Sequence, residues 1–291
     1  MLRLVLPKGS LERATLELFA SADLAVHRSS EVDYSASIDD PRVSEVRILR
    51  PQEIPLYVAE GLFDLGITGR DWIEETGADV VSLGELGYSK ATDLPVRIVL
   101  AVAAGSDVEK VEDLPRRCRV ATEYPRLTER FLAERGVEAE VRFSHGATEA
   151  KVPDIADAVV ELTETGRALR AAGLRVLETL LVSRTELVCS RQAAADASKA
   201  RAISQLHVLL QGALEARGKV LVKLNVAAED LEAVISVLPS MRSPTVSALS
   251  GGEGFAVETV VPKREINVLI PALKERGASD ILELDLSKIV H

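Results

Sequence analysis

The sequence predicts an α/β protein with parallel strands, followed by a smaller C-terminal module. Two observations support this prediction. Short apolar runs alternate with helical patterns through most of the first 215 residues, as is typical of alternating strands and helices. From residue 219 onward the order changes to strand, helix, two strands, helix and strand. A length of 291 residues suits about two domains of the usual ~100 to 200 residues each.

The first 215 residues contain a regular series of expected elements. The chain opens with a strand at residues 2–6, and Ser10 is placed to cap a helix that runs to Phe19. A helix is expected to end at Gly61, and an Ala-rich helix to run to about Gly218. Residues 119–136 are expected to form a strand, a turn and a helix. Residues 155–174 are expected to form a helix or strand, then a turn and a second helix. Further strands are expected at residues 43–49, 62–69, 95–103 and within 181–190.

The C-terminal module has the order βαββαβ. Strands are expected at residues 219–226 and 280–286, and two more flank the turn GGEG. Helices are expected at residues 228–238 and 264–277. This order is typical of a ferredoxin-like (ACT-like) domain, which often binds small regulatory ligands, although the fold by itself assigns no function.

Composition excludes several classes of protein. The chain has 35 Lys and Arg against 45 Asp and Glu, so its net charge is −10, which disfavours nucleic acid as a partner. One Trp, four Tyr and five Phe are too few for base-stacking surfaces. Two cysteines and four histidines predict neither a disulfide framework nor a zinc site. An anionic small molecule remains possible as a substrate, because a local cluster of Arg and Lys can make a pocket positive whatever the net charge of the chain.

No apolar stretch of membrane-spanning or signal-peptide length is found in the sequence. The start MLRLVLPKGSLERA has no signal-type apolar core, and no window of about 18 apolar residues occurs. We therefore expect a cytoplasmic protein with no membrane partner.

The most informative segment is ELTETGRAL, residues 161–169. Hydroxyl groups and a glycine lie where an apolar run gives way to a helix, so backbone N–H groups would point outward and could hold a phosphate. Glu161, four residues before Thr165, could then reach ribose hydroxyls. The alternative is an ordinary helix cap by Thr163 or Thr165, and for the TETG tetrad alone that alternative is the stronger one.

Three cations follow apolar stretches. Lys8 lies with Gly9 in a strand-to-helix turn, where it could contact a phosphate. Arg28 and Arg50 lie just beyond apolar runs, where a guanidinium could bind phosphates with two hydrogen bonds. For Lys8 alone, a solvated turn lysine is at least as good an interpretation. For each arginine alone, a surface charge is the stronger one, because most arginines are merely surface charges.

Further polar groups lie at other expected strand ends. Gly69 and Asp71 follow the apolar run in FDLGITGRD, where they suit a bound anion or hydroxyl, or else a structural glycine turn capped by Asp71. Glu123 and Glu149 lie in TEYP and GATE, and open α/β sheets bind ligands at the carboxyl ends of their strands. The histidines have no metal-binding spacing, and GxSxG, GxxxxGK[ST] and GxGxxG are absent.

Five segments together resemble the long form of the ATP phosphoribosyltransferase family. They are PKGSL at the start, RPQEIPLYVAEGLFDLGITGRD at 50–71, ATEYP at 121–125, GATEAKVPDIADAVVELTETGRALRAAGL at 146–174 and SMRSPTVSAL at 240–249. Each motif is weak alone, but all five occur in the family's order and spacing, and the resemblance covers essentially the whole chain.

The resemblance implies two α/β lobes, similar to type II periplasmic binding proteins, with the substrate cleft between them. Lobe I would comprise residues 1–94 and 183–214, lobe II residues 95–182, and a regulatory domain residues 215–291. The implied reaction, the first step of histidine biosynthesis, is attack of adenine N1 of ATP on C1 of phosphoribosyl pyrophosphate, with loss of pyrophosphate and assistance from Mg²⁺ held by substrate phosphates. Histidine would act as a feedback inhibitor, and the chain would form homo-oligomers, as dimers and hexamers.

The resemblance also assigns roles to residues. Lys8, Arg28 and Arg50 resemble the cations around pyrophosphate and nucleotide, and Arg28 is the least securely placed. The ribose 5-phosphate loop corresponds to Glu161, Thr163, Glu164, Thr165, Gly166, Arg167, Ala168 and Leu169. Residues that resemble the cleft lining are Gly69, Asp71, Glu123 and Glu149, and those near the histidine site are Thr245, Ser247, Leu249 and Ala256.

Three positions depart from the family pattern. The family commonly has Asp at 161, Thr at 168 and Arg at 10, where this chain has Glu161, Ala168 and Ser10. A longer carboxylate shifts the charge by about one methylene, and the lost hydroxyl removes a phosphate donor worth about 0.5 to 1.5 kcal/mol or more. We expect altered affinity rather than lost activity. The alternative function is a non-catalytic cytosolic ligand sensor that uses the same cleft.

Overall fold

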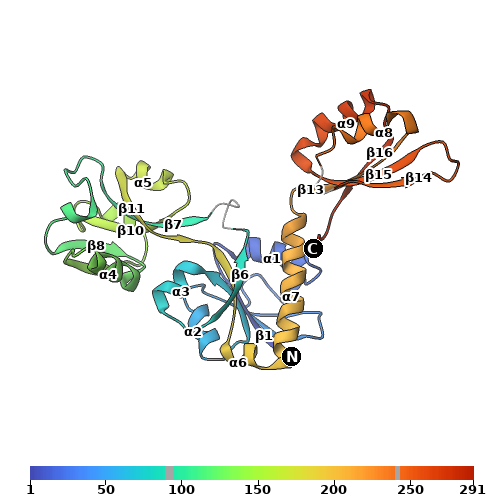
Figure 1. Ribbon diagram of the computed structural model, residues 1–291. Coiled ribbons are helices and arrows are strands. Elements are labelled where there is room, and N and C mark those ends of the chain that lie inside the picture. Colours follow the sequence, from blue (N-terminus) through green and yellow to red (C-terminus); the bar gives the residue numbers. More distant parts are fainter. Residues whose placement is uncertain (89–94, 240–242) are drawn as a thin grey trace. The chain divides into compact units, whose positions relative to one another are not determined.

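The structure, a computed structural model, describes residues 1–88, 95–239 and 243–291. The start of the SMRSPTVSAL segment, residues 240–242, lies outside these ranges. The expected crossing between the lobes near residue 95 follows directly on residues 89–94, which also lie outside them. The described chain forms two units, residues 1–207 and 208–291 (Figure 1). The boundary falls inside a long helix.

The first unit contains a seven-stranded sheet with the strand order β2-β3-β4-β1-β5-β12-β6. Its central strands are buried on both faces, which fits their continuous apolar sequences. The strands are β1 (Leu2–Pro7), β2 (Val26–His27), β3 (Ser35–Ile38), β4 (Val43–Leu49), β5 (Leu65–Gly69), β6 (Val81–Leu86) and β12 (Thr185–Cys189).

A second, five-stranded sheet in the same unit has the order β11-β7-β10-β8-β9. One of its faces carries a core that includes Ile98, Val120 and Phe131, and the other carries Val99, Val159 and Leu169. The strands are β7 (Val96–Ala103), β8 (Cys118–Thr122), β9 (Ala139–Phe143), β10 (Ala158–Thr163) and β11 (Leu174–Ser183).

The two sheets are built on the same plan. In the first sheet β1 pairs with β4 and β5 in parallel, and β12 is inserted antiparallel between β5 and β6. In the second, β8 pairs with β9 and β10 in parallel, and β7 is inserted antiparallel between β10 and β11. In each sheet the inserted strand has just arrived from the other sheet. This confirms the predicted two-lobed, type II periplasmic-binding-protein-like class.

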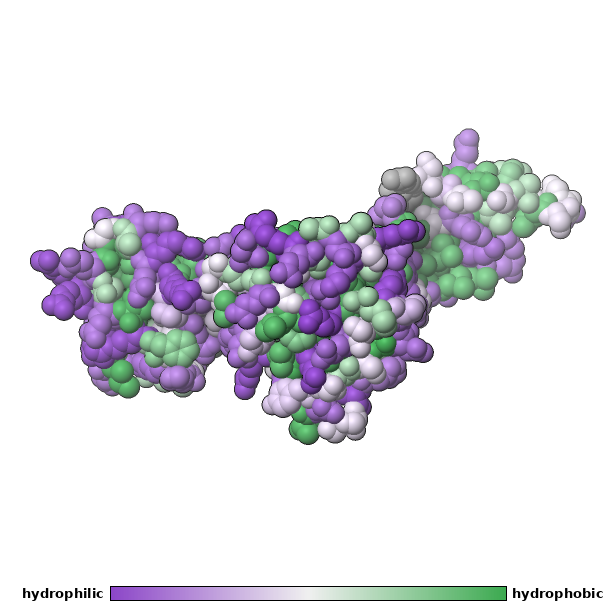
Figure 2. Space-filling model, turned by 90° about the horizontal axis from the view of Figure 1, so that it is seen from below, coloured by the Kyte–Doolittle hydropathy of each residue, from purple (hydrophilic) through white to green (hydrophobic). Residues whose placement is uncertain are grey.

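Helices cover the faces of both sheets. Each of the longer ones buries an apolar stripe, such as Leu127, Phe131 and Leu132 of α4. On the face of this unit seen in Figure 2, hydrophilic residues predominate and hydrophobic ones are scattered among them. The helices are α1 (Glu12–Ser21), α2 (Ile54–Ala59), α3 (Arg70–Thr76), α4 (Pro125–Glu134), α5 (Arg167–Ala171), α6 (Arg191–Ala195) and α7 (Ala197–Ala216), the last of which continues into the second unit.

The second unit confirms the βαββαβ prediction. Its sheet has the order β14-β15-β13-β16, and every pairing in it is antiparallel. The two helices pack on one face through a core that includes Val222, Val234 and Leu273. The elements are β13 (Lys219–Val226), α8 (Leu231–Ile235), β14 (Thr245–Ala248), β15 (Phe255–Pro262), α9 (Ile266–Glu275) and β16 (Ser279–Asp285).

Several local predictions were wrong. The sheets of the first unit are mixed rather than purely parallel, because each receives an antiparallel strand from the other. Ser10 does not cap α1; Leu11 occupies the cap position, and Glu12 accepts a hydrogen bond from the Gly9 N–H at 3.1 Å. The Ala-rich helix breaks at Asp196, which separates α6 from α7. Strands β2, β3, β6 and β9 were not predicted.

A buried carboxylate ties α7 to the first sheet. Asp64, 3% exposed, accepts hydrogen bonds from the Arg3 backbone N–H at 2.8 Å and from the Lys199 ammonium at 2.7 Å. By contrast, Arg191 of α6 pairs with Asp79 at 2.5 Å, where both side chains are about two-thirds exposed. The two ion pairs come from neighbouring helices but differ in solvent access.

Replacing Lys199 by Met should therefore destabilise the protein. The Asp64 carboxylate would lose the nearer of its two cationic partners while it stays buried. The Arg3 guanidinium, 3.8 Å away, would not replace the hydrogen bond from Lys199, so the free energy of unfolding should fall by about 1 to 3 kcal/mol. Arg191→Ala, which removes the exposed pair, should leave stability unchanged within the error of measurement. Urea unfolding followed by circular dichroism checks both; equal losses would contradict the assignment.

Candidate active site

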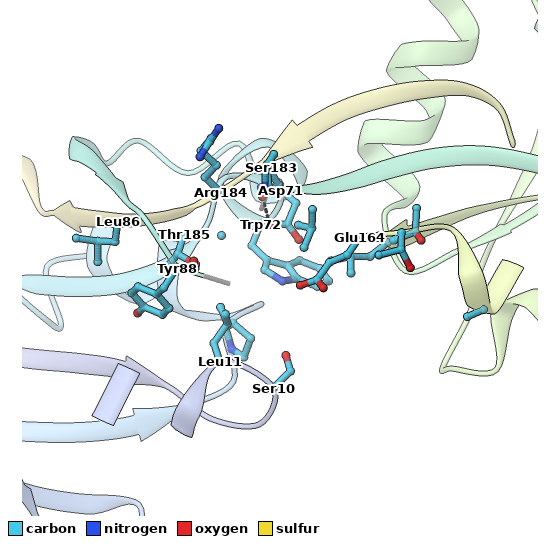
Figure 3. A pocket seen from close by; sticks show the side chains of 18 of the residues that line it. Ser10, Leu11, Asp71, Trp72, Leu86, Tyr88, Glu164, Ser183, Arg184 and Thr185 are labelled. Atoms are coloured by element: carbon cyan, nitrogen blue, oxygen red, sulfur yellow. Dashed lines mark hydrogen bonds between the residues drawn. The ribbon is translucent and has the colours of Figure 1, made fainter. Parts of the chain in front are cut away.

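A cavity of about 350 Å³ lies in the first unit, between strand ends of both sheets (Figure 3). Its polar wall comes from the residue 163–168 turn and from the start of α3, and its apolar wall includes Leu11, Trp72 and Leu86. Seven of the predicted site residues line it: Gly69, Asp71, Thr163, Glu164, Thr165, Arg167 and Ala168.

Asp71 is the most constrained side chain of this cavity. It is 3% exposed, and its Oδ1 accepts a hydrogen bond from the Ser183 hydroxyl at 2.7 Å, drawn as a dashed line in Figure 3. Its Oδ2 accepts one from the Tyr124 hydroxyl at 2.9 Å, and its backbone N–H donates to Ser183 Oγ at 3.0 Å. Burial raises the pKa of Asp71, and the hydrogen bonds from Ser183 and Tyr124 oppose that rise. One carboxylate thus joins α3, the chain crossing at Ser183 and the end of β8.

Gly69 makes room for this carboxylate. A Cβ at Gly69 would lie 2.1 Å from Asp71 Oδ1, so any other residue would displace the side chain. Gly69 is also the N-cap residue of α3. The alternative that Asp71 merely caps the helix is therefore wrong, because Asp71 lies inside the first turn and bonds to Ser183 and Tyr124.

Helix α3 of the first sheet is bound closely to α4 of the second. The rings of Trp72 and Tyr124 stack with centroids 4.6 Å apart. The Glu75 carboxylate accepts hydrogen bonds from the N–H groups of Arg126 at 3.1 Å and Leu127 at 2.9 Å, at the N-terminus of α4. Burial raises the pKa of Glu75, and these two N–H groups oppose the rise. The bonds hold the two sides of the cavity in register.

The residue 161–169 segment forms a tight turn between β10 and α5. Thr163 Oγ1 accepts a hydrogen bond from the Gly166 N–H at 2.8 Å. Gly166 has φ 71° and is the N-cap of α5, so neither Thr163 nor Thr165 is the cap. The first bond of the helix runs from the Arg170 N–H to the Gly166 carbonyl, so the helix itself does not use the N–H groups of residues 167–169. Leu169 is buried in the core and anchors the turn.

Glu161, at the base of this turn, feels the charges of two other glutamates. Burial raises the pKa of Glu161, and the negative charges of Glu123 and Glu149 raise it further. A side-chain hydrogen bond from Thr148 and the Leu162 N–H, 3.1 Å from Oε1, lower it. None of these three glutamates lines the cavity itself.

The predicted cations also lie outside the cavity lining. The Lys8 ammonium lies over the Tyr34 ring, 3.9 Å from its centroid. Arg28 pairs with Glu12 at 2.8 Å, and its side chain is largely buried. Arg50 is exposed at the end of β4, and within the described ranges no carboxylate pairs with it. The structure does not bring these three residues to one point.

The predicted regulatory residues lie at one edge of the second unit. Thr245 and Ser247 belong to the edge strand β14, and Ser247 pairs with Ala256 of β15. Leu249 follows β14, where its N–H donates to the Gly254 carbonyl at 2.9 Å. A cavity of about 340 Å³ includes Thr245 but not Ser247, Leu249 or Ala256.

Sequence reasoning missed several residues that build the site. Tyr124 lies inside the ATEYP motif but was not singled out, although its place after a strand was an available signal. Ser183 and Trp72 carried no local signal, because their role depends on contacts across the fold. Across residues 1–88, 95–239 and 243–291, no three or more His, Cys, Asp or Glu are grouped so as to hold a metal ion, and no helix is long and apolar enough to cross a membrane.

The fold and this cavity define a two-lobed α/β protein whose ligand would bind at the carboxyl ends of strands. Comparison with known proteins identifies the family. Residues 50–212 match the model of ATP phosphoribosyltransferase, and residues 216–288 that of the HisG C-terminal domain. The chain belongs to the ATP phosphoribosyltransferase family, in the long form that carries this C-terminal domain.

Individual relatives agree with this assignment. An ATP phosphoribosyltransferase of Desulforudis audaxviator is 48% identical and one of Pelotomaculum thermopropionicum 46% identical, each over 99% of both chains. A solved structure described as the ATP phosphoribosyl transferase (HisG:HisZ) complex from Thermotoga maritima is 25% identical, with TM-score 0.62, over 72% of this chain and 97% of that chain.

The raised pKa of Asp71 predicts a pH dependence of stability. As pH rises from the ordinary value of 3.8 through the higher folded-state pKa, the unfolded chain loses the proton first, so ionisation of Asp71 lowers the free energy of unfolding. Asp71→Asn has no proton to lose. Its stability relative to the wild type should therefore increase with pH over that window, as measured by urea unfolding between about pH 4 and 7.

Tyr124→Phe serves as the control, because it keeps the carboxylate and should keep the wild-type direction of the slope. A stability difference between Asp71→Asn and the wild type that does not change with pH would show that Asp71 does not titrate in this window.

Proposed function

We propose that this protein transfers the phosphoribosyl group of phosphoribosyl pyrophosphate to N1 of ATP, the first step of histidine biosynthesis. The observation that carries the proposal is the family match over nearly the whole chain, joined to a cavity lined by the 163–168 turn. The products are N1-(5-phosphoribosyl)-ATP and pyrophosphate.

The chemistry requires alignment more than a reactive protein group. A bond forms between adenine N1 and ribose C1 while the bond from C1 to the pyrophosphate oxygen breaks. Pyrophosphate is a good leaving group, so the protein must hold two anionic substrates in line and stabilise the departing charge. No nucleophile of the protein is needed.

We assign the ribose 5-phosphate to the turn at residues 163–169. Backbone N–H groups at the start of α5, with the hydroxyls of Thr163 and Thr165, supply hydrogen-bond donors for it. Glu161, at the base of the turn, would accept hydrogen bonds from the ribose hydroxyls. Ala168 has no hydroxyl to offer, so the backbone carries more of the phosphate binding at that position. Gly69 and Asp71 line the opposite wall, and Glu123 and Glu149 flank Glu161.

Pyrophosphate and nucleotide would meet the cations that follow the first strands. Arg50, exposed and without a carboxylate partner in the described chain, is the best placed of the three to stabilise the leaving pyrophosphate. Lys8 can turn from the Tyr34 ring at little cost. Arg28 would first have to leave Glu12, which makes it the weakest of the three assignments.

Mg²⁺ would enter with the substrates. Carboxylate oxygens such as those of Glu123, Glu149 and Glu161 are ligands that Mg²⁺ prefers, but they are not grouped closely enough to hold the ion by themselves. Substrate phosphates would therefore supply most of its ligands, and the ion would neutralise charge on the pyrophosphate.

The remaining parts of the proposal concern organisation and regulation. We assign residues 1–94 with 183–214 to lobe I, 95–182 to lobe II and 215–291 to a regulatory domain that binds histidine near Thr245, Ser247, Leu249 and Ala256. We also propose a cytoplasmic homo-oligomer, a dimer or hexamer. A non-catalytic sensor is not favoured, because the full-length relatives are named as enzymes.

The reaction and the role of Arg50 are tested together. Purified protein with ATP, phosphoribosyl pyrophosphate, Mg²⁺ and inorganic pyrophosphatase should form phosphoribosyl-ATP, followed by absorbance and mass spectrometry. Arg50→Ala should lower turnover more than tenfold, because an unneutralised leaving group raises the barrier by at least about 1.4 kcal/mol. Its melting temperature should barely change, since the side chain is exposed.

Arg13→Ala is the matched control, because Arg13 is an exposed arginine that, among the described residues, pairs with Glu17 of its own helix. It should keep wild-type turnover. An unfolded or fully active Arg50→Ala enzyme would defeat the assignment, and absence of product from the wild type would defeat the proposed reaction.

Histidine should inhibit the wild-type enzyme through the second unit. The double variant Thr245→Val, Ser247→Ala removes two hydroxyls from the edge strand without adding bulk. The histidine concentration that halves the rate should rise at least tenfold, because the loss of about one hydrogen bond to a charged ligand weakens binding by about that factor. Lys263→Ala, which removes an exposed ion pair with Asp285 in the same domain, should keep wild-type inhibition. Unchanged inhibition in the double variant would place the histidine site elsewhere.

A further inference from the structure

A mostly buried ion pair lies beside the turn that joins β1 to α1. Glu12 Oε1 and Arg28 Nη1 are 2.8 Å apart, and the two side chains are 18% and 14% exposed. The other carboxylate oxygen of Glu12, Oε2, accepts a hydrogen bond from the Gly9 backbone N–H at 3.1 Å. One carboxylate therefore joins the guanidinium group of Arg28 to the backbone of the turn.

Glu12 contacts the turn through its backbone as well as its side chain. Its N–H donates to the Gly9 carbonyl at 3.1 Å, so both backbone polar groups of Gly9 are bonded to Glu12. Gly9 has φ 89°, a left-handed conformation that favours glycine. At the start of the turn, the Lys8 N–H donates to the Leu49 carbonyl at 2.6 Å. The position of the Glu12 carboxylate therefore determines where the Gly9 N–H points.

Arg28 is held in turn by the loop that follows β2. Its Nη1 has two protons, and two oxygen atoms lie close to it: Glu12 Oε1 at 2.8 Å and the Glu31 carbonyl at 2.9 Å. The Ser29 hydroxyl donates to Asp33 at 2.5 Å and closes the same loop. The guanidinium group could turn toward a ligand only by breaking both of its contacts.

The turn that Glu12 holds reaches the candidate active site. Ser10 and Leu11 line the cavity, and both are labelled in Figure 3. Lys8, at the other end of the turn, is one of the three cations assigned above to pyrophosphate and nucleotide. Glu12 and Arg28 are not among the residues that line the cavity. Their effect on a substrate would therefore pass through the turn.

We propose that Glu12 and Arg28 are positioning residues, which hold the residue 8–10 turn in the conformation that meets the pyrophosphate group of phosphoribosyl pyrophosphate. The proposal rests on the proposed function, in which Lys8 contacts pyrophosphate. It replaces a direct contact of Arg28 with substrate, the weakest of the assignments above, by an indirect one. Arg28 orients the Glu12 carboxylate, and Glu12 orients the backbone between Lys8 and Ser10.

The direct and the indirect role of Arg28 predict opposite effects of removing Glu12. Glu12→Met removes both acceptor oxygens and keeps the length of the side chain. If Glu12 positions the turn, kcat/KM for phosphoribosyl pyrophosphate should fall about tenfold, close to the value of one hydrogen bond to a charged group. If Arg28 instead binds the substrate itself, Glu12→Met would release its guanidinium group, and kcat/KM would be unchanged or higher. Either of these two results would overturn the proposal.

A double-mutant cycle tests whether Arg28 acts through Glu12. Arg28→Met alone should lower kcat/KM about fivefold, because Glu12 loses the group that orients it. Arg28→Lys keeps a positive charge that can donate to Glu12, and it should restore kcat/KM to within about twofold of the wild type. In the Glu12→Met enzyme, Arg28→Met should lower kcat/KM further by less than about twofold. Fully multiplicative effects would overturn the indirect role.

Arg42→Met is the matched control. Arg42 pairs with Asp40 at 2.5 Å in the same lobe, and the two side chains are 24% and 10% exposed, so this variant also breaks a mostly buried ion pair. The pair lies at the opposite end of β1, where the Arg42 carbonyl accepts a hydrogen bond from the Leu2 N–H at 2.7 Å. Arg42→Met should keep kcat/KM within about twofold of the wild type, even if it lowers the melting temperature.

Failure of the positioning role and failure of the proposed function give different results. A wild-type protein without product would reject the function. A loss of kcat/KM in Lys8→Met together with wild-type values in Glu12→Met would reject the positioning role alone. Should Glu12→Met fail to fold, Glu12→Gln decides the question, because it breaks the ion pair and keeps one acceptor oxygen. Its kcat/KM should fall about threefold, and an unchanged or higher value would overturn the proposal.

Discussion

The architecture of the site depends on the buried carboxylate of Asp71. It accepts hydrogen bonds from Ser183, where the chain returns from the second sheet to the first, and from Tyr124 at the end of β8. Because burial makes the charged form costly, the carboxylate remains in place only where both hydroxyls reach it. Gly69 is required beside this carboxylate, because a Cβ there would displace it. Trp72 of α3 stacks on Tyr124. The hydrogen bonds of Asp71 therefore set the positions of α3, of the chain crossing and of one wall of the cavity.

Much of the fold follows from local sequence, and much of the site does not. The βαββαβ order could be predicted because each element has a strong apolar period and a glycine or polar turn at its end. Strands β2 and β9 were missed because they are short or largely exposed, so they lack an apolar run. Gly69, Asp71 and the 163–168 turn lie at strand ends and could be predicted. Ser183 and Trp72 could not, because their partners are set by contacts across the fold that sequence spacing does not reveal.

An acidic protein that handles two polyphosphates must gather its donors locally. The chain has a net charge of −10, and acidic residues surround even the proposed ribose site. In the proposed arrangement, backbone N–H groups at the start of α5 would bind a phosphate without adding cations, because they carry no net charge. Specificity for the ribose would then come from geometry rather than from the overall charge of the cleft.

The most direct test of this account is a crystal structure of the full chain with phosphoribosyl pyrophosphate and Mg²⁺. The account predicts that the 5-phosphate lies on the backbone N–H groups of residues 165–169 and that the ribose hydroxyls donate to Glu161. A 5-phosphate bound away from this turn, or a Glu161 side chain directed away from the ribose, would contradict it.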